Sequence, residues 1–351
     1  MKNNMRLTAL ALALACALSA CGGGGGGAAP GQAPNTATNL QAGQTPDAGV
    51  NQPAANGNLQ QNGANGAFSG KLFYEYTGYT TLDLATGAKR PYLPLTTDRF
   101  SFSISSDGQK AYVAEQLTFG DIDRGEGTHR YIVVSTHNGQ QIDTFPGSPG
   151  SLSGMAMNLS PDGQRIATGL LRNGWNGDAH LVVENRHGEV LFDFTEAGYT
   201  GAFGWLPDGR MVATDADGWL TLIDRNFNPV RRIRQFSGPG RPGRMQASPD
   251  GQRLVFNWNQ RIYVMNIDGS NLHQVATSDL WESDVAWSPD SRWLVLAHGE
   301  STCPQLTIVN ADESMVDVSY ATRDPRAHQV QAATGYQGKL EPVCGRSVSW
   351  R

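Results

Sequence analysis

Five arginines lie close together in the sequence around a turn rich in glycine and proline. The turn extends from Ser237 to Gly243, and its flanking arginines are Arg231, Arg232, Arg234, Arg241 and Arg244. Guanidinium groups bind carboxylates and phosphates through paired hydrogen bonds. We therefore expect a basic edge that could bind a partner's carboxylates or lipid phosphates. A solvated turn between two strands is the alternative.

Three carboxylates form a second group with a chemical pattern. Asp121, Asp123 and Glu126 lie among three glycines, and alternating carboxylates on such a loop can bind calcium. The segment lacks the full pattern of a calcium-binding loop. A solvated insertion between two strands is the alternative, so we predict no metal ligand here.

The remaining residues predict no catalytic centre. The chain has no Gly-x-Ser-x-Gly motif for a nucleophilic serine and no glycine-rich phosphate loop. Its formal net charge of −5 does not support a general nucleic-acid role. We predict no catalytic residue, no metal and no cofactor. The histidines are scattered, without the spacing of zinc ligands: His129, His137, His180, His187, His273, His298 and His328.

The first twenty residues predict an export signal. Lys2 and Arg6 precede the apolar segment Leu7 to Ala20, which is too short to span a bilayer. The segment ends in Leu-Ser-Ala-Cys, which resembles the lipobox of bacterial lipoproteins. That resemblance implies cleavage after residue 20 and attachment of lipid, including palmitate, to Cys21. Gly22 in place of an aspartate implies the outer membrane, facing the periplasm. An ordinary signal peptide followed by an incidental cysteine is the alternative.

Residues 21–67 predict a lipidated flexible tether. From Gly22 onward the segment is dominated by Gly, Ala, Asn, Gln, Pro and Thr, and Asp47 is its only charged residue. Such a segment has too little apolar surface to fold. As a flexible coil it would have a root-mean-square length of about 35–40 Å.

Two of the four cysteines remain for the folded part. Cys16 belongs to the predicted signal and Cys21 to the lipid anchor, which leaves Cys303 and Cys344. Two cysteines in an exported domain suggest one disulfide. A catalytic or metal-binding thiol pair is the alternative, although there is no Cys-x-x-Cys spacing to support it.

A repeated turn organises residues 68–351. Its aspartates are Asp107, Asp162, Asp208, Asp250 and Asp290, separated by 55, 46, 42 and 40 residues. Each lies in a Ser-Pro-Asp-Gly sequence or a close variant, between two short apolar segments. Proline presets φ and glycine accepts a positive φ, so each copy predicts a turn between two strands. Repeats of about 40–50 residues are typical of propeller blades.

This pattern resembles the repeats of TolB-like β-propellers, which are related to WD-repeat propellers. The resemblance covers nearly all of residues 68–351 and implies an all-β domain with six four-stranded antiparallel blades. Aligning the copies predicts a buried row in the first strands: Phe102, Met157, Phe203, Met245, Val285 and Val348. The last positions of these strands predict a second large row: Ile104, Leu159, Trp205, Ala247, Trp287 and Trp350. Arg244 and Asp284 are register equivalents and could pair across the channel wall.

The two ends of this region complement each other. Arg346 to Arg351 matches the first strand of a blade, whereas Lys71 to Tyr76 and Thr80 to Leu84 match later strands of a blade that lacks its first. We expect the C-terminal strand to complete the N-terminal blade and close the ring.

Two functions from different classes follow. The first is a monomeric, non-enzymatic interaction module that binds an envelope protein or peptide and contacts the membrane through its lipid anchor. The second is a metal-dependent hydrolase or lactonase that uses the central channel. By resemblance to six-bladed lactonases, Glu282, Asp284 and Asn158 would be the ligands available on the inner strands.

Overall fold

The computed structural model of the chain describes residues 65–119, 126–153, 157–171, 179–238, 240–320, 324–334 and 339–351. The chain divides into two compact units, Met1–Gln60 and Gln61–Arg351, and every described residue belongs to the second. All elements of this part are β-strands. A search of the same residues finds no helix that could cross a membrane. The predicted signal, Cys21 and residues 22–64 of the tether lie outside the described residues.

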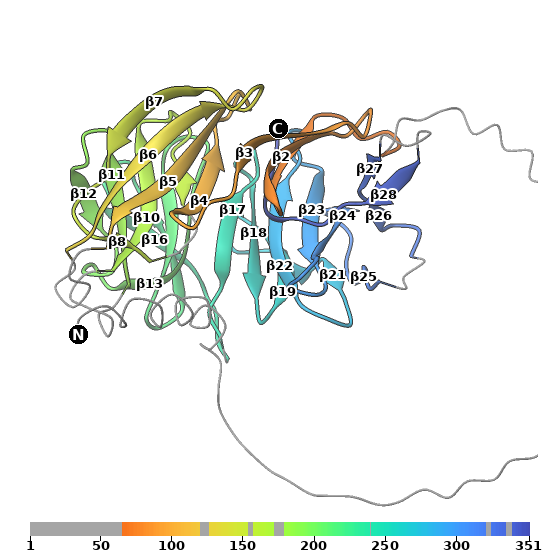
Figure 1. Cartoon of the computed structure of the whole chain (residues 1–351). Helices are drawn as coiled ribbons and strands as arrows, with labels where there is room; N and C mark the ends of the chain where they lie inside the picture. The colour runs from red at the N-terminus through yellow and green to blue at the C-terminus, as the bar shows by residue number, and fades with distance from the viewer. Residues whose placement is uncertain are drawn as a thin grey trace, which may run out of the picture. The chain divides into compact units, whose positions relative to one another are not determined.

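The six predicted antiparallel blades are present (Figure 1). From the innermost strand outward, blade 1 contains β29 (Arg346–Trp350), β1 (Lys71–Glu75), β2 (Gly78–Asp83) and β3 (Lys89–Pro94). Blade 2 contains β4 (Arg99–Ile104), β5 (Lys110–Thr118), β6 (Thr128–Ser135) and β7 (Gln141–Pro146). In blade 3 the first strand is divided into β8 (Ser151–Leu152) and β9 (Asn158–Leu159), followed by β10 (Arg165–Leu171), β11 (Ala179–Asn185) and β12 (Val190–Asp193).

The other three blades follow the same order. Blade 4 contains β13 (Tyr199–Trp205), β14 (Met211–Asp215), β15 (Trp219–Ile223) and β16 (Pro229–Gln235). Blade 5 contains β17 (Gly243–Ala247), β18 (Arg253–Trp258), β19 (Arg261–Asn266) and β20 (His273–Gln274). Blade 6 contains β22 (Glu282–Trp287), β23 (Trp293–His298), β24 (Gln305–Asn310) and β26 (His328–Gln329). Two short pairs lie outside the blades: β21 (Ala276–Thr277) with β25 (Val316–Asp317), and β27 (Gln331–Ala333) with β28 (Leu340–Pro342).

The repeated turn joins the first and second strands of a blade through local hydrogen bonds. In blade 5, Ser248 Oγ donates to Asp250 Oδ1 at 2.5 Å and accepts the backbone N–H of Arg253 at 3.0 Å. The same pair of bonds recurs in the turns that begin at Ser105, Ser160 and Ser288. The residue that follows the aspartate has a positive φ, which is +73° at Gly251 and +62° at Ser291. The turn therefore depends only on residues adjacent in sequence.

The innermost strands form a closed ring around a central channel. At every junction a hydrogen bond joins neighbouring inner strands or the residues next to them. The donor and acceptor pairs are Arg351 to Ser105, Leu159 to Ser103, Trp205 to Asn158, Ala202 to Pro242, Gln246 to Val285 and Val348 to Asp284. The blades are thus connected next to the channel as well as through their hydrophobic faces.

The predicted core rows are largely confirmed. All six members of the first row are at most 7% exposed. In the second row, Ile104, Trp287 and Trp350 are buried, whereas Leu159, Trp205 and Ala247 are half-buried. All six residues of this row line the channel, and these three are its less buried half.

The predicted closure of the ring is also confirmed. β29 pairs antiparallel with β1, and Lys71 and Arg351 exchange two backbone hydrogen bonds of 2.7 and 2.9 Å. In Figure 1 the marked C-terminus accordingly lies beside β2. The chain contacts the propeller from Asn65 onward, three residues before the predicted start at Phe68. The Asn65 side chain is buried, donates to the carbonyls of Leu84 and Gln331, and accepts the Gln331 N–H.

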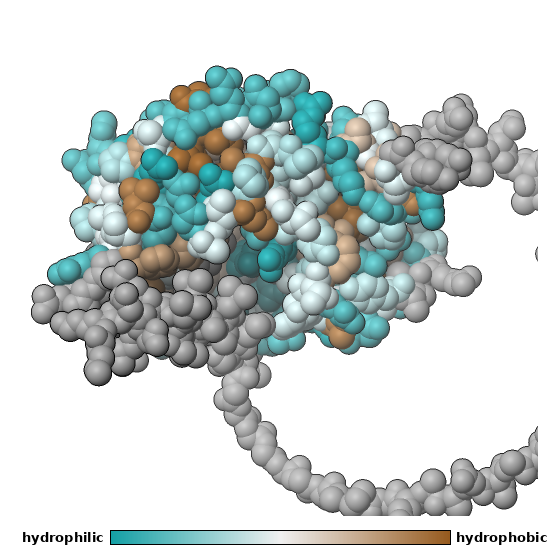
Figure 2. Space-filling view, viewed as in Figure 1, coloured by the Kyte–Doolittle hydropathy of each residue, from teal (hydrophilic) through white to brown (hydrophobic). Residues whose placement is uncertain are grey.

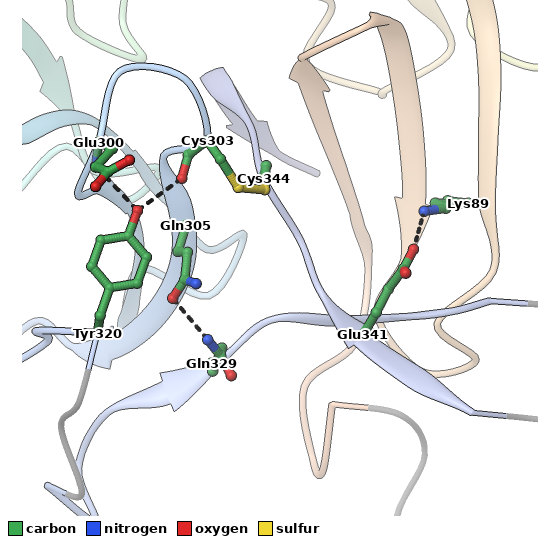
Figure 3. Close-up of a disulfide and its surroundings, with 8 residues drawn as sticks. All are labelled: Lys89, Glu300, Cys303, Gln305, Tyr320, Gln329, Glu341 and Cys344. Atoms are coloured by element: carbon green, nitrogen blue, oxygen red, sulfur yellow. Dashed lines mark hydrogen bonds and ion pairs between the residues drawn. A yellow bond between two sulfur atoms is a disulfide. The ribbon is translucent and has the colours of Figure 1, made fainter.

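The predicted disulfide joins Cys303 to Cys344 across 41 residues, with their Cα atoms 5.0 Å apart (Figure 3). It links the loop before β24 to the segment that leads into β29. Nearby, the Tyr320 hydroxyl donates to the carbonyl of Cys303 at 3.0 Å. Lys89 of blade 1 pairs with Glu341 of β28 at 2.6 Å. The segment before the closing strand is therefore attached to both blades that it connects.

Candidate functional site

The central channel contains a cavity of about 620 Å³. Every blade contributes residues of its first strand or of the turn that follows it. Because each blade begins with its innermost strand, the six inner strands run in the same direction. The channel therefore has two different ends, one at the starts of these strands and one at their last residues.

Indole rings and prolines surround the end formed by the last residues of the strands. Trp205, Trp287 and Trp350 line the cavity there. Their indole N–H groups donate to the carbonyls of Asn158, Gln246 and Ser69, at 3.0 to 3.3 Å. The rings are thereby held in fixed orientations. The repeated turns add Pro161, Pro207, Pro249 and Pro289. We name this end the tryptophan mouth, defined by these three tryptophans and four prolines.

Four charged residues lie at the other end. Arg244 Nη1 is 3.0 Å from Asp284 Oδ2, and Arg346 Nε is 3.3 Å from Glu75 Oε1. The arginine side chains are 44% and 56% exposed, whereas those of Asp284 and Glu75 are 5% and 16% exposed. The guanidinium groups therefore face solvent in front of the carboxylates. We name these four residues the charged end.

Electrostatics at the charged end couple the two pairs. Burial raises the pKa of Glu75 above its usual value, and the nearby Asp284 carboxylate acts in the same direction. Arg346 and Arg244 lower that pKa, but their effect is smaller than that of burial. A ligand that brings another negative charge to this end would bind the exposed guanidinium groups rather than the carboxylates.

Backbone irregularities orient the side chains at this end. The inner strands β4, β13, β17, β22 and β29 each have a register shift near their first residues. Arg244 in β17 and Ser347 in β29 adopt positive φ values of 46° and 54°. Such bulges redirect side chains and are frequent at the rims of β-structures.

The expected pairing of Arg244 with Asp284 is confirmed. Asp284, one of the three candidate metal ligands, is therefore already engaged in an ion pair. Asp284 Oδ2 also accepts the backbone N–H of Val348 at 3.2 Å. Asn158 and Asp284 line the channel, whereas Glu282 does not. Glu282 is buried against blade 5, where its Oε2 accepts the N–H of Ile262 at 2.7 Å. The structure therefore does not bring the three predicted channel ligands together.

The five arginines of the predicted basic edge are divided among three places. Arg231, Arg232 and Arg234 lie on β16, the outermost strand of blade 4. Arg231 and Arg234 donate to carbonyls of the Ile267–Gly269 turn in blade 5, and Arg232 lies over the Trp219 ring. Arg241 donates to the carbonyls of Asp215 and Ala216, while Arg244 faces the channel.

The candidate calcium loop, for which the sequence predicts no metal ligand, lies mostly outside the described residues, which include Glu126 but neither Asp121 nor Asp123. A feature that the sequence analysis missed is a second cavity of about 500 Å³. It shares Pro161, Trp205 and Pro207 with the tryptophan mouth and extends to Arg165 and Arg225. The spacing of Trp205 and Pro207 could have indicated this cavity. A large residue two positions before the turn proline lies, like the proline, at the end of the inner strand and therefore at the same mouth of the channel.

Comparisons with known proteins give evidence of fold. No protein-family model matches the chain, and no curated protein is significantly similar in sequence. The crystal structure of TolB from Acinetobacter baumannii is similar, with a TM-score of 0.55 and 18% identity over 81% of this chain and 67% of that one.

Two other structures have lower scores. A TolB-type protein from Agrobacterium tumefaciens has a TM-score of 0.49 and 16% identity over 70% of this chain and 87% of its own. A protein assigned as a 6-phosphogluconolactonase from Bacteroides uniformis has a TM-score of 0.48 and 17% identity over 80% of this chain and 98% of its own. The described part of the chain thus has a six-bladed β-propeller fold like that of the Acinetobacter TolB structure.

Proposed function

We propose that this chain is a lipid-anchored protein of the bacterial cell envelope whose propeller binds a segment of another envelope protein at its central channel. The observation that carries the proposal is the open channel of about 620 Å³, with the half-buried Trp205 ring and four exposed prolines at one end and two exposed guanidinium groups at the other. An amphipathic peptide segment is the kind of ligand that uses both surfaces.

The tryptophan mouth supports the recognition of apolar side chains. The Trp205 ring and the four exposed prolines offer apolar area that a ligand can bury, and aromatic residues are enriched among the residues that contribute most to interfaces. Because the Trp205 N–H is already bonded to the Asn158 carbonyl and the Trp287 and Trp350 rings are buried, the mouth loses little freedom when a ligand binds. The adjoining cavity near Arg165 and Arg225 lengthens the surface for an extended segment.

The N-terminal sequence supports a location in the cell envelope. The export signal and the lipobox-like segment before Cys21 would anchor the chain by lipid, and Gly22 favours the outer membrane facing the periplasm. The tether of residues 21–67 would let the propeller reach partners away from the membrane surface. On the face shown in Figure 2, hydrophilic residues predominate and the hydrophobic residues form separate patches. This distribution supports a monomer.

Site-specific photocrosslinking in cells tests the proposal. A photoreactive residue would replace the exposed Ser106, which lines the tryptophan mouth, and in a matched variant it would replace the exposed Val230 on the outer strand β16. We expect a discrete protein adduct from position 106 that is absent from position 230.

A second comparison separates the channel from the basic strand. Reversing the charges of Arg231, Arg232 and Arg234 should leave the adduct from position 106 unchanged. An adduct that forms only from position 230, or one that the charge reversal removes, would place the partner on the outer edge and contradict a channel site.

A further inference from the structure

One group of potential metal ligands lies away from the channel, on blade 3. Within the described part of the chain it is the only set of three histidine, cysteine, aspartate or glutamate side chains with converging ligand atoms. The residues are His180, Asp193 and Glu196, and their ligand atoms all lie within 4.8 Å of one another. No spacing in the sequence marks this group, because its histidine is thirteen residues from the nearer carboxylate.

Antiparallel pairing brings the histidine and the aspartate together. Val182 of β11 pairs with Asp193 of β12, so His180, two residues earlier on β11, lies diagonally across from Asp193 on the same face. The His180 Nδ1 and Asp193 Oδ2 atoms are 2.8 Å apart. Both side chains are largely shielded, with 14% and 8% exposure. The two groups are therefore held by strand geometry rather than by a loop.

A tight turn places the third ligand. The other carboxylate oxygen of Asp193 accepts the backbone N–H of Glu196 at 3.0 Å. The turn is closed by hydrogen bonds from Ala197 to the Asp193 carbonyl and from Tyr199 to the Phe194 carbonyl, at 3.2 and 2.8 Å. Phe194 is fully buried and fixes the turn to the blade. The Glu196 side chain is exposed, so an ion can reach the site from solvent.

We propose that His180, Asp193 and Glu196 bind one divalent transition-metal ion, with zinc as the model ion and water completing its coordination. One imidazole nitrogen with two carboxylates is a ligand set for zinc and related ions, whereas calcium and magnesium prefer oxygen ligands alone. Zinc binding requires the imidazole tautomer that carries its proton on Nε2. Nδ1 and Asp193 Oδ2 would then separate slightly, to admit an ion about 2.0–2.2 Å from each.

Such an ion would cross-link the outer edge of blade 3. β12 has four residues and is the outermost strand of its sheet. The ion would join β11 to the turn that leads from β12 to β13, so the blade would resist unfolding better with zinc than without it.

Zinc titration of the chelator-treated full chain, prepared without a histidine tag, tests the site. Isothermal calorimetry should show one zinc ion per chain, and thermal unfolding should shift to higher temperature as zinc is added. The variants His180→Ala and Glu196→Gln should each weaken zinc binding by about tenfold or more. Asp193→Asn keeps an oxygen that can accept the Glu196 N–H, and it should weaken zinc binding as well.

His187→Ala is the matched control, since His187 is an exposed histidine in the β11–β12 turn of the same blade. It should bind zinc as the unaltered chain does. Absence of stoichiometric zinc binding by the unaltered chain would overturn the proposal. Equal zinc affinity in the unaltered chain and in either the His180 or the Glu196 variant would also overturn it.

Discussion

Two junctions between blades are held together in different ways. The closing seam lies where β29, which follows blade 6 in the chain, completes blade 1, and it consists of β29, β1 and residues 330–334 and 339–345. It combines the antiparallel β29–β1 pairing, the Cys303–Cys344 disulfide and backbone bonds such as Ala333 N–H to the Gly87 carbonyl at 2.8 Å. The junction between blades 2 and 3 has instead a buried cluster of polar side chains.

We name this cluster the Glu184 junction, defined by Glu184, His129, Tyr131 and Ser148. The Glu184 carboxylate accepts the Tyr131 hydroxyl at 2.7 Å and the Ser148 N–H at 3.1 Å, and it also accepts the Ser148 hydroxyl. His129 Nε2 lies 3.5 Å from the same carboxylate, and both side chains are fully buried. A Cβ atom at residue 147 would lie 2.0 Å from His129 Nε2, so this approach requires Gly147.

The difference follows from chain connectivity. Blades 2 and 3 are consecutive, so the chain already keeps them close and side chains suffice to fix their orientation. Blade 1 takes β29 and β1 from opposite ends of the folded region, and bringing the ends of a long chain together has a large entropic cost. Main-chain pairing and a covalent bond at the seam offset that cost.

Removal of the closing strand should have the largest effect. Deletion of residues 347–351 exposes the edges of β1 and removes Val348 and Trp350 from the core that blades 6 and 1 share. We expect the truncated chain to unfold or to form oligomers through the free edge. Size-exclusion chromatography and thermal unfolding would show this. A monomer with unchanged melting would refute the importance of the seam.

Disruption of the Glu184 junction should cause the second largest loss of stability. Glu184→Ala leaves three buried polar groups without their shared acceptor, and we expect a loss of about 3–5 kcal/mol in the free energy of unfolding. Denaturant unfolding measures this loss. Glu189→Ala, at an exposed glutamate of the same hairpin, is the control and should cost less than about 1 kcal/mol. Similar losses in the two variants would show that the junction contributes little.

Loss of the disulfide should have a somewhat smaller effect than loss of the closing strand. The double variant Cys303→Ser/Cys344→Ser frees a loop of about 40 residues, and we expect a loss of about 2–4 kcal/mol while the ring stays closed. A reductant should lower the melting temperature of the unaltered chain but not that of the double variant. Equal responses to the reductant would exclude a stabilising disulfide.

A second buried glutamate, at a third junction, shows how hydrogen-bond donors affect the pKa of a buried carboxylate. Glu282, between blades 5 and 6, is as buried as Glu184. Burial raises the pKa of Glu282 to about 7, because the N–H of Ile262, Arg261 and Ser278 compensate only in part. At Glu184 burial also acts to raise the pKa, but the bonds from His129, Ser148 and Tyr131 outweigh it and lower that pKa.

The two glutamates should therefore have opposite effects on pH stability. Because the folded pKa of Glu282 is raised, the unfolded chain loses that proton first, and stability falls as the pH rises from about 4.3 to about 7. Glu282→Gln should remove this fall, which we expect to be on the order of 2 kcal/mol. Glu184 contributes stability above its unfolded pKa and loses it as the pH falls through its lowered folded pKa. Unfolding measured from about pH 2 to pH 8 checks both signs, and parallel pH profiles of the Glu282 variant and the unaltered chain would contradict the first.

The exposed ion pair at the seam should have the smallest effect. The side chains of Lys89 and Glu341 are 41% and 45% exposed, so solvent screens their attraction. Lys89→Ala should change the free energy of unfolding by less than about 1 kcal/mol. A larger loss would mean that surface charge, and not main-chain pairing, holds the seam.

Much of the fold was predictable from residues that are close in sequence. The turns around Asp107, Asp162, Asp208, Asp250 and Asp290 are built from bonds that span at most five residues, so their spacing alone indicates the blades. The apolar row from Phe102 to Val348 and the complementary chain ends also followed from the repeat, because each blade has the same register. The cysteine pair followed from the small number of cysteines.

The contacts between polar side chains of different blades could not be predicted from the repeat. Glu184 and His129 are separated by 55 residues, and no spacing in the sequence indicates that they meet. The five arginines appear as one group in the sequence, yet the turn between β16 and β17 sends Arg244 into the channel and leaves Arg231 on the outer strand.

The sequence alone thus determined the turns, the alternation within the inner strands and the number of blades, since these depend on local backbone geometry and a short period. Only the closed ring decided which polar groups share a junction and which aromatic rings face the channel. Those contacts depend on the relative placement of strands from different blades, which no short stretch of sequence specifies.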